Sequence, residues 1–352
     1  MRYDGAMTYL SVLDQSPIRS GATPADAVEE TLRLAEFVDR LGYRRYWLAE
    51  HHSSNGLAGS SPEVLIPLVA SRTERIRVGS GGVMLSHYSP LKVAENFRML
   101  ETLFPGRIDL GIGRAPGSDQ LTDRALMAGP GALGAEHYPS QVRDLIGYLD
   151  GRLPDDHPFA RIRVMPAGPG APDLWLLGSS NQSAMLAAHF GCSFSFAHFI
   201  TAEGGPEAME YYRQNYRPSA LWPEPGGSIG VFVLCAETEA AAERLMRSRD
   251  LWTLRQRRGI TAPVPTFEEA DTYDYEPRDL EMIAYNRERC VWGTPDKVKA
   301  ALEELSRRYG VDEIVLLTIC ARFEDRLRSY ELLAEAFDLT PELAAAEATA
   351  PA

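Results

Sequence analysis

The sequence predicts an α/β fold, a single (β/α)8 TIM barrel with insertions, over residues 8–340. Short apolar runs typical of strands alternate with amphipathic helical stretches, with eight strands and at least eight helices in one continuous series. Such alternation indicates right-handed βαβ units around a parallel sheet. Polar residues directly follow several of the strands, where barrels of this kind carry their active sites. A doubly wound sheet is the alternative, but no break divides the chain into two halves.

The first part of the chain contains four strand–helix repeats. The first helix begins with Thr23 as a cap and Pro24 at the first helical position, and Gly42 ends it. Apolar residues recur at spacings of three or four in each helix, which is the period of a buried helical face. The expected strands are 9–13, 46–49, 76–79 and 107–113, and the expected helices are 24–41, 62–73, 90–104 and 139–149.

The second part continues the series and contains two interruptions. The expected strands are 174–177, 192–196, 229–235 and 313–317, and the expected helices are 181–190, 202–216, 237–257, 294–309 and 323–337. The Gly-rich segment 115–138 and the segment 258–292, which has no steady period, are expected to be insertions that serve as lids. The tails 1–7 and 344–352 are expected to be disordered.

Composition and charge narrow the class of protein. Apolar residues make up 45% and charged residues 24%, as in a soluble globular protein. The formal net charge of −13 argues against a nucleic acid or an anionic membrane as partner. No apolar run is long enough for a membrane span, no signal peptide is expected, and four scattered cysteines without a CxxC pair suggest reduced thiols. We therefore expect a cytoplasmic location.

The apolar run 46–49 ends in Glu50, His51 and His52 and is followed by a Gly/Ser loop. Titratable groups at the carboxyl end of a buried strand are candidates for catalysis. Successive strand residues point to opposite sides, so at most one of the two histidines faces the barrel axis. The structural alternative is that one histidine caps the next element and the other packs in the core.

Two further motifs are candidates for binding a ligand. Gly178, Ser179 and Ser180 lie between a strand and a helix, where hydroxyls and free helix N–H groups favour a phosphate, and Arg114 at another strand end supplies a positive charge. Gly81 and Gly82 end a buried strand and suit a sharp turn or a backbone that lies against a flat ligand. Taken separately, these motifs are also found in ordinary helix caps and loops.

Four motifs in this order resemble the bacterial-luciferase-like flavin-dependent monooxygenase family. The resemblance covers residues 10–196, and more weakly 291–337, and is carried by segments 47–52, 78–83, 110–114 and 178–180. It implies a barrel that binds reduced FMN (FMNH2) at its carboxyl end, with the phosphate held by Arg114, Ser179 and Ser180. It also implies that Gly81 and Gly82 lie under the isoalloxazine ring, joined by a cis bond, and that His51 is catalytic.

Glu50 is expected to orient His51, and His198 is expected to be one of the cofactor-binding residues. His198 stands where the luciferase itself has a tryptophan, and Gly113 stands where it has a reactive cysteine. Light emission is therefore not implied. The chain is more similar to the standalone branch of the family, some members of which modify polyketides and other natural products. The sequence assigns no metal ligands.

The expected activity is that of a two-component monooxygenase acting on a small organic substrate, such as a polyketide or another secondary metabolite. A separate NAD(P)H:flavin reductase would supply FMNH2, because no GxGxxG fingerprint follows a strand, and O2 would form a 4a-peroxyflavin. Epoxidation, hydroxylation and Baeyer–Villiger oxidation all remain open. The alternatives are a deazaflavin-dependent oxidoreductase and a non-catalytic flavin-binding homologue. Helices 24–41, 62–73 and 90–104 are the expected surface of a homodimer.

Overall fold

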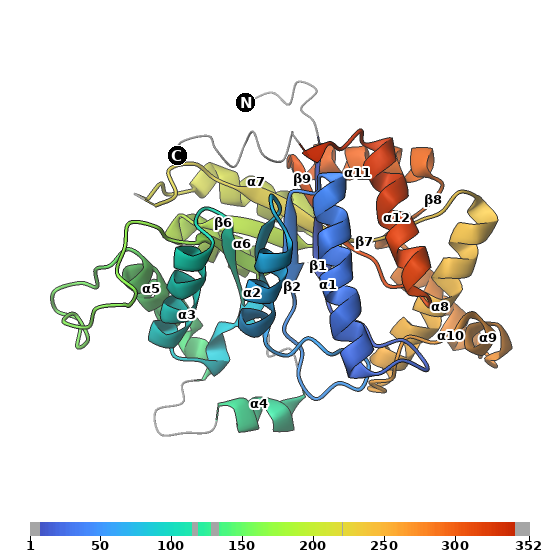
Figure 1. The fold of residues 1–352 in the computed structure, drawn as a ribbon, viewed down its shortest axis with the longest axis horizontal. Helices are drawn as coiled ribbons and strands as arrows, with labels where there is room; N and C mark the ends of the chain where they lie inside the picture. The colour runs from blue at the N-terminus through green and yellow to red at the C-terminus, as the bar shows by residue number, and fades with distance from the viewer. Residues whose placement is uncertain (1–7, 115–118, 128–133, 220, 342–352) are drawn as a thin grey trace.

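The computed structural model describes residues 8–114, 119–127, 134–219 and 221–341. Eight parallel strands close into a barrel, and helices surround it (Figure 1). Each strand pairs with the next along the chain from β1 to β7, and β9 joins β7 to β1. The TIM barrel expected from the sequence is confirmed, and its strands are β1 (Tyr9–Asp14), β2 (Arg45–Leu48), β3 (Arg77–Met84), β4 (Ile108–Gly113), β5 (Asp173–Gly178), β6 (Ser193–Ala197), β7 (Gly227–Cys235) and β9 (Glu313–Leu317).

The helices that cover the barrel begin and end at the expected signals. Thr23 caps α1 in a capping box with Asp26, and Gly42 ends it in the left-handed conformation, at φ 91°. Two 3₁₀ turns, η1 (Leu85–His87) and η2 (Ala135–His137), precede helices. The surrounding helices are α1 (Pro24–Leu41), α2 (Pro62–Arg72), α3 (Pro90–Leu103), α5 (Tyr138–Leu149), α6 (Asn181–Phe190), α7 (Gly205–Asn215), α8 (Glu239–Arg257), α11 (Pro295–Tyr309) and α12 (Phe323–Ala336).

The pleat of the strands separates two buried regions. Residues such as Val12, Tyr46 and Leu110 belong to the large core formed by the outer side of the strands and the helices. The alternate residues point inward and form a separate cluster, whose buried members are Leu13, Trp47, Ala49, Trp175, Val315 and Leu317. This inner cluster fills the middle of the barrel, as in other barrels of this class.

Charged groups fill the barrel interior at the amino ends of the strands. Arg45 donates to both carboxylate oxygens of Asp109 at 2.9 Å and to Glu313 Oε1 at 2.9 Å. Trp47 Nε1 also donates to Asp109 Oδ2, at 2.9 Å. The interior is therefore packed from this end up to the tryptophans, and a ligand can enter only from the carboxyl ends of the strands.

The segment 258–292 corrects one expectation. It contains two helices, α9 (Phe267–Thr272) and α10 (Pro277–Arg287), and a strand outside the barrel, β8 (Cys290–Gly293). The segment is therefore more regular than expected. Strand β7 is long enough to pair with β6 through Gly227–Gly230 and with β8 through Phe232–Cys235. The strand was missed because it has only four residues, three of them half-buried, and therefore carries little hydrophobic pattern.

The insertion after β4 carries a short helix, α4 (Gln120–Leu126), which lies apart from the other helices at the lower edge of Figure 1. Asp119 caps this helix and accepts from the N–H groups of Leu121 and Thr122. Parts of the segment 115–138, and the expected tails 1–7 and 344–352, lie outside the described residues.

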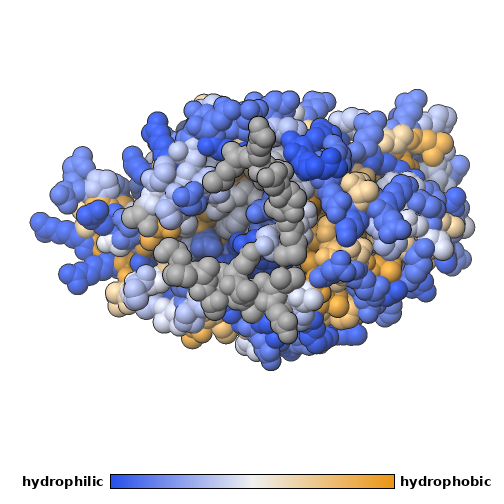
Figure 2. Space-filling model, turned by 90° about the horizontal axis from the view of Figure 1, so that it is seen from above, coloured by the Kyte–Doolittle hydropathy of each residue, from blue (hydrophilic) through white to orange (hydrophobic). Residues whose placement is uncertain are grey.

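Hydrophilic side chains make up most of the outer rim of the face that lies uppermost in Figure 1, and hydrophobic ones gather in smaller areas (Figure 2). Within the described part of the chain, none of the helices has the length and apolar character needed to cross a membrane.

Candidate functional site

A cavity of about 720 Å³ opens at the carboxyl ends of the strands. All eight barrel strands contribute to its wall, and its volume lies within the usual range of cofactor and ligand sites. Of the described residues that line it, His51 and Arg114 are the titratable ones. The cavity is thus mostly apolar, with a few polar groups that can orient a ligand.

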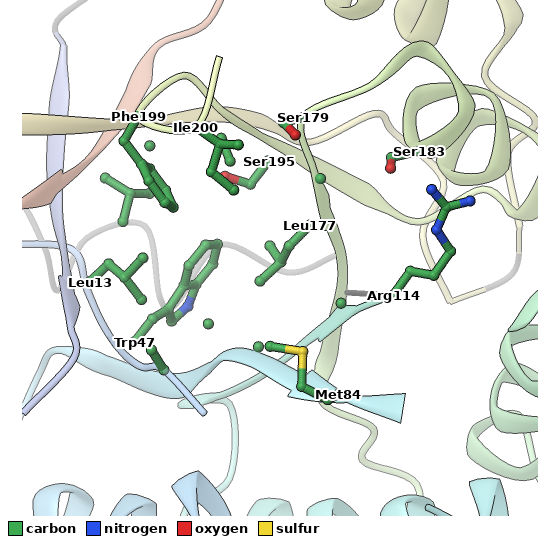
Figure 3. A pocket seen from close by; sticks show the side chains of 18 of the residues that line it. Leu13, Trp47, Met84, Arg114, Leu177, Ser179, Ser183, Ser195, Phe199 and Ile200 are labelled. Atoms are coloured by element: carbon green, nitrogen blue, oxygen red, sulfur yellow. The ribbon is translucent and has the colours of Figure 1, made fainter. Parts of the chain in front are cut away.

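The two ends of the cavity differ in polarity (Figure 3). Leu13, Trp47 and Phe199 lie together at one end. Arg114, Ser179 and Ser183 lie at the other end, where two strands stop beside the start of a helix. Such a cavity suits an elongated ligand with an aromatic part and an anionic part.

The polar end combines a cation with the amino end of α6. Ser180 is the N-cap, and its Oγ accepts from the N–H of Ser183 at 3.4 Å. Arg114 directly follows β4 and extends over the same helix turn, where its guanidinium donates to the side-chain oxygen of Gln182. The first N–H groups of a helix and an arginine fork together form a site for a phosphate. The structure therefore brings Arg114, Gly178, Ser179 and Ser180 into one wall of the cavity.

The glycine pair of β3 forms another part of the wall. The Gly81–Gly82 peptide bond is cis, as the family resemblance implied. A Cβ atom on Gly82 would lie 2.7 Å from the carbonyl oxygen of Gly111, and one on Gly81 would lie 2.6 Å from Leu13 Cδ1. Only glycine fits at these two positions, so bare backbone faces the cavity here.

His51 lies beyond the end of β2, not within it, and lines the cavity. Its backbone N–H donates to the carbonyl of Gly59 at 2.8 Å, which fixes the loop. Burial, together with the nearby charge of His52, lowers the pKa of His51 to about 4. Its Nδ1 is buried and has no hydrogen-bond partner among the described residues. The ring is therefore neutral near pH 7.

The expectation that Glu50 orients His51 is wrong. Glu50 is fully buried outside the cavity lining, and its Oε1 accepts from His52 Nε2 at 2.7 Å. The same carboxylate accepts from the hydroxyl of Tyr88 at 2.8 Å and from the N–H of Met84 at 2.9 Å. Glu50 thus connects the loop after β2 to the end of β3. The sequence could not reveal this because the three donors belong to two separate segments.

His198, which was expected to bind the cofactor, does not line the cavity. Its Nδ1 makes a 2.7 Å hydrogen bond with the hydroxyl of Tyr309 on α11, and the ring is buried away from the cavity. The next residues, Phe199 and Ile200, take its place in the wall. Burial, and then the charges of Arg308 and Arg289, lowers the pKa of His198 to about 4.

Several cavity residues were missed from the sequence, namely Leu13, Trp47, Met84, Ser183 and Phe199. Ser183 carried a readable signal, since it lies in the first turn of the helix that follows Ser179 and Ser180. The others are apolar residues at strand ends, and nothing in their local pattern separates a cavity wall from ordinary core.

Comparisons with known proteins match almost the whole length of the chain. The family model described as luciferase-like monooxygenase matches residues 8–313. The Bacillus subtilis protein YwcH is 49% identical over 94% of this chain and 99% of its own length. The N-acetyl-S-alkylcysteine monooxygenase of the same organism is 37% identical over 94% of this chain and 98% of its own length. The crystal structure of apo-MsnO8 is 41% identical, covers 95% of this chain and 99% of its own, and superposes with a TM-score of 0.86.

More distant structures share only the fold. The oxygenating constituent of 3,6-diketocamphane monooxygenase in complex with FMN is 20% identical, covers 96% of this chain and 98% of its own, and has a TM-score of 0.67. An F420-dependent secondary alcohol dehydrogenase is 12% identical, covers 94% of this chain and 99% of its own, and also has a TM-score of 0.67. The fold thus occurs with both FMN and the deazaflavin F420.

The low pKa of His198 predicts a loss of stability in acid. At pH 5 the unfolded chain binds a proton at this residue, whereas the folded chain, with a pKa of about 4, does not. The free energy of unfolding should therefore fall by about 2 kcal/mol from this group between pH 7 and pH 5, and His51 acts in the same direction. His198→Gln should reduce the fall measured by urea denaturation at the two pH values. The exposed His189 is the matched control, and an undiminished fall in His198→Gln would contradict the assignment.

Proposed function

Because the chain belongs to the luciferase-like monooxygenase family, we propose that it is an FMNH2-dependent monooxygenase that uses O2 to oxidise a small organic substrate. One observation carries the proposal: the cavity has an anion-binding end at Arg114 and α6, a glycine backbone wall, and a neutral histidine, all at the carboxyl end of the barrel. Fold alone would not distinguish this activity from others.

The residues present fit reduced FMN. Arg114, Ser179 and the N–H groups of α6 would hold the phosphate, because they offer a charge and several donors in one place. Gly81 and Gly82 line the cavity with bare backbone, against which a flat ring would lie, because no side chain fits at either position. When bound, the flavin supplies the electrons and the reaction with O2.

The protein's own contribution is to exclude water and to place a proton. Trp47, Leu177 and Phe199 form the wall of the apolar part of the cavity. His51 is neutral near pH 7 because burial lowers its pKa to about 4, so its ring can accept or donate a hydrogen bond without bringing in a charge. We assign His51 as the group that holds or moves a proton at the reacting atoms.

We propose a substrate without a required charge at its reacting end, because the residues near that end are apolar. A polyketide or another secondary metabolite satisfies this condition. The relative named for N-acetyl-S-alkylcysteine adds small thioethers to the candidates. Product analysis with one ketone, one alkene and one thioether would separate Baeyer–Villiger oxidation, epoxidation and sulfur oxidation.

Assays of the same purified protein also test two alternative functions. A deazaflavin-dependent oxidoreductase, as in the F420-dependent neighbour of the same fold, would turn over without O2 when given reduced deazaflavin. A non-catalytic flavin-binding homologue would bind FMN and form no product with any substrate. We favour the monooxygenase because the relatives with substantial identity include a named monooxygenase.

We further propose two partners and a location. A separate NAD(P)H:flavin reductase would deliver FMNH2 transiently, and the chain would act in the cytoplasm. A second copy of the chain would cover the exposed apolar side chains of α2 and α3. These are Val64, Leu68, Met99 and Leu103, which are 61%, 46%, 51% and 58% exposed.

Replacing Arg114 tests the proposed phosphate-binding site. Arg114→Ala should weaken FMN binding about 10- to 100-fold, because a charge-assisted hydrogen bond contributes about 1.5–3 kcal/mol, and Arg114→Lys should weaken it less. Flavin fluorescence quenching measures both. Riboflavin lacks the phosphate, so its affinity should not change, and the exposed Arg143 serves as control. Equal FMN affinity in wild type and Arg114→Ala would remove Arg114 from the site.

Replacing His51 tests the proton role. His51→Ala should fold and bind FMN, because the phosphate grip lies elsewhere, while product formation falls about 10²- to 10⁴-fold. The reduced flavin should still consume O2 and release hydrogen peroxide, so the ratio of peroxide to product should rise. His189→Ala, an exposed change on α6, is the control. Normal product yield in His51→Ala would leave this histidine without a catalytic role.

Charges on α2 and α3 test the dimer. Wild type should have twice the 38.9 kDa mass of one chain by light scattering at micromolar concentration. The pair Leu68→Lys and Leu103→Lys should give the single-chain mass, because two buried ammonium groups would face the partner. Leu280→Lys, at a 56% exposed position on α10, should not. A wild type that is monomeric throughout would refute the interface.

A further inference from the structure

Three side chains beside the cavity form a cluster that the proposed reaction does not use. The ligand atoms of Glu50, His52 and His87 all lie within 4.8 Å of one another. Glu50 is fully buried, and the side chains of His52 and His87 are 13% and 0% exposed. They come from the loop after β2 and from η1 after β3, so the fold brings together residues that are distant in sequence.

His87 is arranged as a metal-binding histidine usually is. Its Nε2 makes a 2.8 Å hydrogen bond with Asp123 Oδ1, which fixes the ring and its tautomer. Its Nδ1 is buried and has no partner within the described part of the chain. A carboxylate on one ring nitrogen and a free second nitrogen is the typical arrangement around protein metal sites. An unpaired buried nitrogen without such a use is costly.

We propose that Glu50, His52 and His87 bind one divalent metal ion, such as zinc. Two imidazoles and one carboxylate are a common ligand set for zinc and neighbouring metals. The ion would replace the proton between His52 and Glu50, and their ligand atoms, now 2.7 Å apart, would move apart to bind it. The remaining positions would be filled by water, and Asp123 would support His87 from outside. No oxidation or reduction is involved.

The site would stabilise the rim of the cavity. Glu50 is adjacent to His51, and it accepts from the N–H of Met84, which also lines the cavity. Asp123 belongs to α4, in the insertion that follows β4. One ion would therefore hold the ends of β2 and β3 and connect them through His87 to α4. The metal would act by positioning these segments, since the ligands themselves do not line the cavity.

The competing explanation is that Glu50–His52 and His87–Asp123 are two separate hydrogen-bonded pairs. It leaves the His87 Nδ1 without a partner among the described residues. It also predicts that neither histidine matters to metal binding. The proposal does not depend on the assigned reaction, because the site and the anion-binding end of the cavity share no residue.

Titration with Co²⁺ tests the site on tag-free protein that has been treated with EDTA. Wild type should bind one Co²⁺ per chain with visible d–d absorption, Zn²⁺ should displace it, and Zn²⁺ should raise the melting temperature. Wild type that shows no saturable binding of either ion overturns the proposal, whatever the variants do.

Matched variants separate this site from surface binding. His87→Gln should weaken Co²⁺ binding at least about 100-fold, and Asp123→Asn about 10- to 100-fold. His157→Gln is the control, because His157 lies 3.5 Å from the carboxylate of Asp144 but outside the cluster. If His87→Gln does not fold, as judged by circular dichroism, His52→Gln takes its place. Unchanged Co²⁺ affinity in the folded variant overturns the proposal.

Discussion

The buried ion group at the amino end of the barrel is the constraint on which the site depends. Arg45 lies between Asp109 and Glu313 and donates to both, and Arg77 donates to Asp109 as well. Burial alone would raise the pKa of Asp109, but the charges of Arg45 and Arg77 outweigh it and hold the pKa below its ordinary value. Removing one partner of such a group costs about 3–5 kcal/mol, because the other charges stay buried.

This ion group also holds the floor of the cavity. Asp109 accepts from Trp47 Nε1, and the Arg45 guanidinium lies 4.8 Å from the ring centre of Trp175. The two tryptophans meet edge to face, with ring centres 5.1 Å apart. Both rings are thereby locked in one orientation. The ion group thus supports the tryptophans from the amino end of the barrel.

Binding and chemistry are assigned to different parts of the rim. The proposed anion-binding end is made by Arg114 and the first turn of α6, which follow β4 and β5. His51 is on the loop after β2, and Glu50 holds that loop against the end of β3. This separation explains why a change at one place should leave the other intact.

The sequence by itself determined the repeat and the motifs. Alternating strands and helices, with proline and glycine at helix ends, specify the barrel, because these are local properties of the chain. Ser179 and Ser180 could be named as candidate binding residues because a strand end followed by a helix start is also a local signal, and Arg114 because it directly follows a predicted strand. Alternation along a strand could not place His51 and His52, since β2 ends at Leu48 and both lie beyond it.

Only the tertiary structure decided which groups meet. Glu50 pairs with His52 rather than His51, His198 turns to Tyr309, and β8 pairs along the second half of β7. These contacts join segments that are distant in the chain or depend on the exact turn of a loop. The hydrophobic period of each segment carries no information about them. The free energy of packing and of satisfying buried polar groups selects them when the barrel closes.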